Sequence, residues 1–198
     1  SRRARPAKPA TPARGPGEFP PIDEVESVRS LGGSTGAELV KDTKTGNRFV
    51  QKRGVSPDHV REEFAADQAY RAAGIDVPRA VLYDTPAGPV KLAEFIEGDD
   101  LRSYLAKASP ADSEAVLKRI RKGFAADSLL ANHDVTGLSL DNIIVDAKGV
   151  PWRIDNGGSL RFRAQGAPKS SAVWNGTVAE LDTLRDSAIN PQTARIFA

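Results

Sequence analysis

The residues best suited to chemistry flank two short apolar runs in the second half of the chain. The runs, at 143–145 and 152–154, are separated by a turn-forming segment, and this pattern predicts a β-hairpin. Because a hairpin brings its two ends together, we expect Asn142, which precedes the first strand, to lie beside Asp155, which follows the second. Carboxylate and amide oxygens are ligands that a hard cation such as Mg²⁺ prefers. The pair therefore predicts a site for a divalent cation.

A Gly-rich turn near the start of the chain offers a second kind of chemistry, the binding of phosphate. The sequence Leu-Gly-Gly-Ser-Thr-Gly-Ala occupies residues 31–37, between two predicted strands. Backbone N–H groups in a turn that lacks bulky side chains can close on phosphate oxygens. The turn is not a P-loop, because neither Gly-Lys-Ser/Thr nor a helix follows it. Taken alone it is better explained as an ordinary hairpin, so its function depends on its partners.

Lys52 is a candidate partner, because it ends the third predicted strand. A lone lysine on a strand is usually solvated, so the interpretation requires a carboxylate opposite it. The next element is a helix over 56–73 that begins with Ser-Pro-Asp and carries Glu62 and Glu63 near its start. We favour Glu63 as the partner of Lys52. Glu62 is the alternative, and solvated glutamates are the simpler explanation for both.

These residues must be positioned by a β-rich first half and a helical second half. Segments 79–83 and 90–96 complete a set of five strands, which together with one helix precede residue 97. Beyond Gly98 the apolar spacing becomes helical, with a short helix near 101–105 and a longer one from 113 to 130. The change of character predicts two lobes with a hinge and a cleft between them.

The expected organisation is a Pro-, Ala- and Arg-rich disordered linker over 1–21, an N-terminal lobe over 22–97 and a C-terminal lobe over 98–198. The predicted fold class is α+β, with an antiparallel sheet and one main helix in the first lobe. The second lobe is expected to be small, mostly helical and to carry the hairpin.

The amino-acid composition limits the chemistry, the binding partners and the cellular location that we expect for the chain. The 198 residues include 39% hydrophobic residues, no cysteine and a net charge of +2, so disulfide and thiolate chemistry are excluded and nucleic acid is not indicated. No apolar run is long enough for a transmembrane helix, and no signal-peptide segment occurs. We expect a soluble monomer that does not bind membranes, either cytoplasmic or secreted as an effector into a host cell. The absence of methionine indicates a fragment of a longer protein.

The order of these parts resembles the protein-kinase superfamily over residues 31–158. Kinases place an asparagine and a metal-binding aspartate at the two ends of a hairpin. Asn142 and Asp155 are 13 positions apart, which is the spacing typical of the family, and Asp155-Asn156-Gly157 stands where Asp-Phe-Gly would stand.

Segment 92–98, Leu-Ala-Glu-Phe-Ile-Glu-Gly, is similar to a kinase hinge. By this resemblance Ala93 is the gatekeeper, and the backbones of Glu94 and Ile96 meet adenine.

The sequence also departs from the kinase pattern. His-Arg-Asp is missing, and Asn132-His133-Asp134 is the nearest equivalent. Asp134 lies eight positions before Asn142 instead of five, so the loop carries about three extra residues, and no Ala-Pro-Glu follows. These features resemble atypical kinases, the HipA-like and phosphatidylinositol-kinase-like group that includes compact bacterial effector kinases. In that group a Glu-aromatic pair, here Glu63-Phe64, opens the helix.

The resemblance implies an ATP- and Mg²⁺-dependent phosphotransferase with three sets of site residues. The implied catalytic residues are Asp134, as acceptor of the hydroxyl proton, Asp155 and Lys52. The implied metal ligands are Asn142 and Asp155. The implied nucleotide-binding residues are Gly32, Gly33, Ser34, Thr35, Gly36, Lys52, Glu63, Glu94 and Ile96.

Several polar residues near the implied site residues have both a functional and a structural explanation. Asp141 is either a spare metal ligand or a turn residue, whereas His133 is expected to order the loop. Asp99 or Asp100 would reach the ribose hydroxyls or cap a helix. The basic loop 161–169 would bind an acidic substrate or simply be solvated.

The leading hypothesis is an atypical bacterial protein Ser/Thr kinase that transfers the γ-phosphoryl group in line to a protein hydroxyl. One alternative is a kinase-like module that binds nucleotide, or nothing, and acts by contact. Further alternatives are the same fold used on a lipid or small molecule, or for adenylylation.

Overall fold

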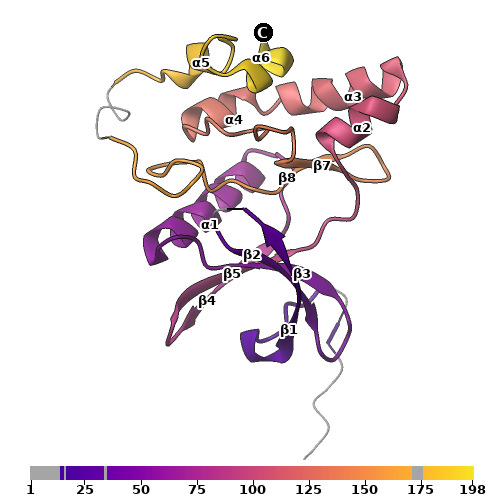
Figure 1. The fold of residues 1–198 in the computed structure, drawn as a ribbon, viewed down its shortest axis with the longest axis vertical. Helices are drawn as coiled ribbons and strands as arrows, with labels where there is room; N and C mark the ends of the chain where they lie inside the picture. The colour runs from indigo at the N-terminus through magenta and orange to yellow at the C-terminus, as the bar shows by residue number, and fades with distance from the viewer. Residues whose placement is uncertain (1–13, 16, 34, 171–175) are drawn as a thin grey trace, which may run out of the picture.

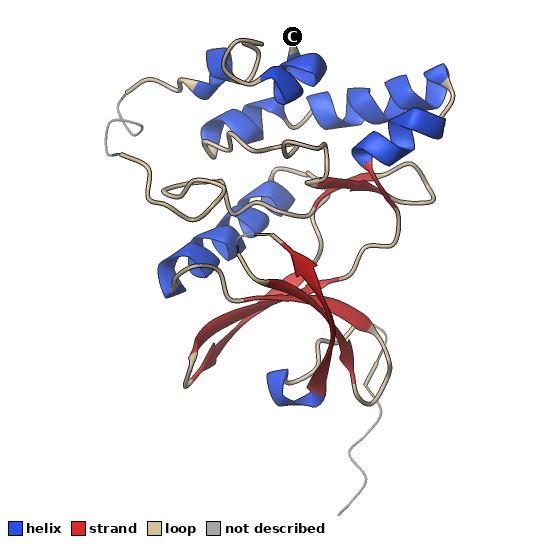
Figure 2. Ribbon diagram, in the orientation of Figure 1, coloured by secondary structure: helices blue, strands red, loops and turns tan. Residues whose placement is uncertain are grey.

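The computed structural model describes residues 14–15, 17–33, 35–170 and 176–198. Ser34 and most of the expected linker, residues 1–13 and 16, lie outside the described residues. The described chain forms an α+β fold in which a β-sheet lies on one side and most helices lie on the other (Figure 1). Figure 2 shows the large sheet, one long helix and a short N-terminal helix below, a small sheet in the middle and the helices of the second half above. The predicted fold class is confirmed.

The larger sheet has five antiparallel strands in the order β1-β2-β3-β5-β4. Buried Val40, Phe49 and Leu92 form the centre of one face. Register pairs Lys52 with Lys91 across neighbouring strands, so two lysines lie side by side on the sheet. The elements are η1 (Ile22–Glu24), β1 (Val25–Gly32), β2 (Ala37–Asp42), β3 (Arg48–Lys52), β4 (Ala80–Thr85) and β5 (Gly88–Glu94).

Helix α1 (Pro57–Ala72) packs against β5 and β4 and turns a polar stripe toward them. Its N-terminus is capped by the Ser56 hydroxyl, which accepts from the His59 N–H at 3.2 Å. His59, Glu63 and Asp67 are all buried and recur every four residues, so they share one face of the helix. Glu63 thus turns inward, as the sequence predicts.

The second half is helical, but the expected long helix over 113–130 is wrong in both its start and its continuity. The helix begins earlier, at Pro110, because the Ser109 hydroxyl caps it by accepting from the Asp112 N–H. It ends at Arg121, and the guanidinium of Arg153 lies against this break: its Nη2 donates to the Ile120 carbonyl at 3.2 Å, and a Cβ at Gly123 would lie 2.2 Å from that atom. The elements are α2 (Leu101–Lys107), α3 (Pro110–Arg121), α4 (Phe124–Leu129), α5 (Glu180–Thr183) and α6 (Pro191–Phe197).

The predicted hairpin is confirmed as β7 (Ile143–Val145) and β8 (Pro151–Arg153), with β6 (Asp99–Asp100) added at its edge. Asp146 closes the turn, since its carboxylate accepts from the N–H groups of Lys148 and Val150. The apolar side chains of the hairpin, including Ile143, pack into the core formed with α2, α3 and α6.

Part of the segment expected to be linker packs against the large sheet. The Phe19 ring lies 5.4 Å from that of Phe49, and the Tyr83 hydroxyl donates to the Pro20 carbonyl at 2.6 Å. The packed part of the chain thus begins ahead of Ile22. None of the described helices is long and apolar enough to cross a membrane.

A buried polar cluster joins the two halves of the molecule. Tyr70 of α1 donates its hydroxyl to Asp127 of α4 at 2.9 Å and accepts from the Asn132 amide at 3.0 Å. Arg153 of β8 donates to both oxygens of Asp127, at 2.9 and 2.7 Å. The hydrogen-bonded cluster fixes α1 against the helical half and therefore fixes the width of the space between them.

Candidate functional site

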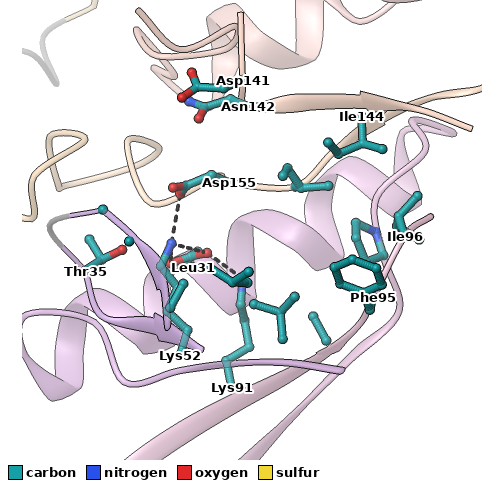
Figure 3. Close-up of a pocket in the computed structure, with 18 of the residues that line it drawn as sticks. Leu31, Thr35, Lys52, Lys91, Phe95, Ile96, Asp141, Asn142, Ile144 and Asp155 are labelled. Carbon is teal, nitrogen blue, oxygen red and sulfur yellow. Dashed lines mark hydrogen bonds and ion pairs between the residues drawn. The ribbon is translucent and has the colours of Figure 1, made fainter. Parts of the chain in front are cut away.

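A cavity of about 530 Å³ lies between the sheet and the hairpin, and both halves of the chain line it. Figure 3 shows Lys52 pointing from the sheet toward Asp155, with Asn142 and Asp141 beyond it. Phe95 and Ile96 lie at the opposite end of the cavity.

Lys52 forms the centre of the cavity floor. Its Nζ lies 2.9 Å from a Glu63 carboxylate oxygen and 2.9 Å from the Asp155 Oδ1. Lys52 is only 4% exposed, so it is not the solvated side chain that a lone lysine on a strand usually is. The strand end is covered because α1 packs over it and brings the Glu63 carboxylate to the ammonium.

Lys91 is a second buried cation that sequence reasoning missed. Its Nζ donates to Glu63 at 2.6 Å and to Asp67 at 2.8 Å. Burial by itself would raise the pKa of Glu63, but the two ammonium groups of Lys52 and Lys91 lower that pKa to about 2. Glu63 is therefore a fixed anion. A signal was present, since Lys91 interrupts an otherwise apolar strand and Asp67 lies one helical turn after Glu63.

Asp155 and Asn156 have different environments, although they are adjacent. The Asp155 side chain is 41% exposed and faces the cavity. Asn156 is buried and donates its amide to Asp67 at 2.8 Å. The residue that stands in place of the kinase phenylalanine is thus a polar anchor. It holds the start of the loop after β8 against α1, which orients Asp155 toward Lys52.

The loop from Asp134 to Asn142, in which the sequence departs most from kinases, folds back on itself. The Gly137 N–H donates to the Asp134 carbonyl and the Asn142 N–H donates to the Thr136 carbonyl, so the extra residues form tight turns. Gly137 adopts φ +73°, and a Cβ there would lie 2.3 Å from the Asp141 carboxylate. The Asn142 amide can therefore donate to the Asp134 carboxylate at 3.0 Å.

The Asp134 carboxyl has an unusual pKa. Burial raises it to about 6, with a further contribution from the negative charges of Asp155 and Asp141, despite the hydrogen bond from Asn142. A carboxylate that titrates near neutral pH is suited to accept a proton.

The Gly-rich turn and the hinge line opposite sides of the cavity. Gly32, Gly33 and Gly36 all have positive φ, and Gly32, Gly33 and Thr35 line the cavity. In the hinge, the Glu94 N–H is already donated to the Arg79 carbonyl. Neither the N–H nor the carbonyl of Ile96 has a hydrogen-bond partner within the described part of the chain.

Several polar residues with two explanations are placed away from the cavity centre. Asp100 caps α2 by accepting from the Ser103 N–H, and Asp99 pairs with Lys107. Glu62 pairs with Arg161, and His133 pairs with buried Glu180 at 2.9 Å. Asp141 lines the cavity, so its two explanations stay open.

The oxygens at the hairpin end suit Mg²⁺ better than a metal held wholly by protein. No group of three acidic or histidine side chains with metal-binding geometry occurs among the residues that the structure describes. Mg²⁺ usually takes one or two carboxylates and completes its shell with phosphate oxygens and waters. Asp155 and Asn142, both lining a cavity large enough for a nucleotide, fit that requirement.

Comparison with protein-family models and with curated proteins gives no match. Among solved structures, the chain is similar to the Cydia pomonella granulovirus kinase PK-1, with a TM-score of 0.53 and 19% identity over 69% of this chain. The chain spans about half the length of that kinase, 52% of it. At this identity the likeness shows the fold alone, which is protein-kinase-like.

Proposed function

We propose that the chain is an ATP- and Mg²⁺-dependent phosphotransferase of the atypical kinase type. The observation that carries this proposal is the convergence of Lys52, Asp155, Asn142 and Asp134 on one cavity between two halves of a kinase-like fold. In this proposal residues 22–97 and 98–198 act as two lobes around the nucleotide.

The nucleotide would lie with its base at the hinge and its phosphates at the Gly-rich turn. The backbone groups of Ile96, which have no partner among the described residues, offer hydrogen bonds to the base, and small Ala93 leaves room beside it. Backbone N–H groups of the turn and the Lys52 ammonium, held by Glu63, would bind phosphate oxygens. Asp155 and Asn142 would hold Mg²⁺, which supplies positive charge against the phosphates.

The chain's own contribution to the reaction is positioning and proton acceptance. Phosphoryl transfer depends on alignment and charge stabilisation more than on covalent chemistry. Asp134, held by Asn142, would orient the acceptor hydroxyl and accept its proton. Lys52 keeps its charge in the site because the carboxylates of Glu63 and Asp155 raise its pKa against the effect of burial.

A protein Ser/Thr hydroxyl is the acceptor that we propose. A second hollow, of about 400 Å³, adjoins the cavity at Asp134 and is lined by the loop at 163–165. Arg161 is paired with Glu62, which leaves the exposed side chain of Arg163 without a partner among the described residues. An acidic residue near the acceptor hydroxyl would suit that cation.

Transfer of label from ATP tests the proposal against its alternatives. The protein is incubated with Mg²⁺, a mixture of cell proteins and ATP labelled at either the γ- or the α-phosphate, with Asp155→Ala as control. We expect protein-bound label from the γ-phosphate only, reduced about 100-fold or more in Asp155→Ala. Label from the α-phosphate would indicate adenylylation, and label in a lipid or small molecule would change the acceptor. No transfer from either label would favour a module that acts by contact.

A further inference from the structure

Lys169 is a half-buried cation that lines the same hollow as Asp134 and has been given no role in the proposed reaction so far. Its Nζ donates three hydrogen bonds, all to backbone carbonyls: Ala131 at 2.5 Å, Gly158 at 2.8 Å and Leu160 at 2.9 Å. A lysine ammonium has three N–H donors and no acceptor, so the three carbonyls satisfy it completely.

The three carbonyls come from the two loops that carry the site. Ala131 precedes the proton acceptor Asp134 by three positions, whereas Gly158 and Leu160 follow Asp155 closely. Ala131 and Leu160 have φ values of 51° and 54°, conformations that are unfavourable for residues with a side chain. The Leu160 N–H also donates to the Leu130 carbonyl at 2.6 Å. Two strained backbones are thus held together, with their carbonyls turned to one cation.

Contacts within the loop at 161–169 place Lys169 next to these three carbonyls. The Lys169 N–H donates to the Arg161 carbonyl at 2.7 Å, and Phe162 pairs with Pro168 as an isolated bridge. At its far end Gly166 has φ +82°, and a Cβ there would lie 2.1 Å from a Val55 methyl carbon. The loop is therefore closed at its base and seated against the N-terminal half.

We propose that Lys169 is a positioning residue that fixes the proton-acceptor loop and the metal-ligand loop relative to each other. The role rests on the proposed function, since it concerns the geometry of Asp134 relative to Asp155. The N-terminal half holds the same loop from its other side, through the His59 ring nitrogen at 3.0 Å from the Gly157 carbonyl and through Asn156. Lys169 supplies the matching contacts from the C-terminal half.

The charge of Lys169 makes the role testable by pH. Burial lowers its pKa to about 8; Glu180 and Glu62 oppose this lowering, and Arg163 adds to it. The neutral amine has only two N–H donors and a lone pair that would face a carbonyl. The alignment of the two loops is therefore expected to weaken as pH rises through about 8.

The test compares the wild type with Lys169→Met and Lys169→Arg, and uses Lys118→Met as the matched control on an exposed helix surface. We expect Lys169→Met to lower kcat by on the order of 10- to 100-fold with little change in the KM for ATP. The wild-type kcat/KM should fall above about pH 8, and Lys169→Arg, which keeps its charge, should lose that fall. A fall at the same pH in the arginine variant would overturn the proposal.

Backbone amide hydrogen exchange gives a readout that needs no transfer. Lys169→Met should speed exchange at 131–134 and at 157–160, whereas Lys118→Met should leave both segments unchanged. Unchanged exchange in Lys169→Met would overturn the positioning role even in an active enzyme. If the wild type transfers no phosphate, the proposed function fails, and exchange alone decides whether Lys169 joins the two loops.

Discussion

The floor of the candidate site is a chain of alternating charges that is buried except at Asp155. Asp155, Lys52, Glu63, Lys91 and Asp67 contact one another in that order, at 2.6 to 3.0 Å. Each ammonium lies between two carboxylates, so both buried cations are compensated. Burial of charges without such partners would be strongly unfavourable. The chain of charges fixes Lys52 at the point where phosphate would lie.

Lys91→Met tests that chain at the cation that does not contact Asp155. The change leaves Asp67 without its cation and Glu63 with one cation in place of two. We expect a loss of about 3–5 kcal/mol in the free energy of unfolding, measured by urea denaturation.

Lys41→Met is the control for Lys91→Met, because Lys41 pairs with Glu26 in solvent, with both side chains about half exposed. Its loss should stay below about 1 kcal/mol. Equal losses in the two variants would contradict the structural role of Lys91.

The raised pKa of Asp134 predicts a pH dependence of the reaction. Below about pH 6 the carboxyl is protonated and cannot accept the hydroxyl proton, so kcat/KM should fall tenfold per pH unit as pH decreases. Above that pH the Asp134 carboxylate is ionised, so kcat/KM should be flat until the separate fall expected above about pH 8. The measurement is the pH profile of kcat/KM, and Asp134→Asn should be much slower and lack the acid limb. An acid limb that survives in Asp134→Asn belongs to another group.

At the scale of elements, α1 and the hairpin do most of the positioning. The hairpin could be predicted because two apolar runs around a turn leave few alternatives, and it places Asn142 and Asp155 at one end. Helix α1 could be predicted because Ser-Pro marks its start and Gly74 follows its end. The inward orientation of Glu63 could be predicted from its position on the helix. Lys91 could not be assigned a partner from sequence, because its partners depend on how α1 packs across β5 in the folded chain.

Interruptions of helices and the turns within loops were harder to predict than the helices and strands themselves. The interruption at Gly123 lies against the guanidinium of Arg153, which is 30 residues away in sequence, so this contact could not be read from the local sequence. The loop at 134–142 looked like the weakest match to kinases. It nevertheless returns Asp134 to Asn142, because Gly137 permits a turn that spacing alone does not reveal.

Substitution of Gly98 tests how tightly the hinge packs against the hairpin. A Cβ at Gly98 would lie 2.3 Å from the Val145 carbonyl oxygen and 2.8 Å from an Ile144 methyl carbon. Gly98→Ala must therefore displace backbone, and we expect a loss of about 1–3 kcal/mol in stability together with weaker ATP binding.

Gly176→Ala is the matched control for Gly98→Ala, because no atom of the described residues lies within 4 Å of its added Cβ. Urea denaturation and nucleotide titration measure both variants. A Gly98→Ala protein as stable as the control would show that the hinge tolerates displacement.

At the scale of the whole molecule, the two halves meet at buried polar contacts on one side and at the cavity on the other. The Tyr70–Asp127–Arg153 cluster joins α1 to the helical half, and Asn156 joins the loop after β8 to α1. Both contacts hold Glu63 and Asp155 near Lys52. The site is therefore assembled by the packing of the two halves, and its residues come from both.

The most direct test of this account is the effect of Mg²⁺ on ATP affinity, measured by isothermal titration calorimetry on the wild type and Asp155→Ala. We predict that Mg²⁺ tightens ATP binding to the wild type by about tenfold or more, a coupling of about 1.4 kcal/mol. Asp155→Ala should lose that gain, because Asp155 is the only carboxylate among the two proposed Mg²⁺ ligands. An ATP affinity that is the same with and without Mg²⁺, or a full Mg²⁺ effect in Asp155→Ala, would contradict the assignment of this cavity as a metal–nucleotide site.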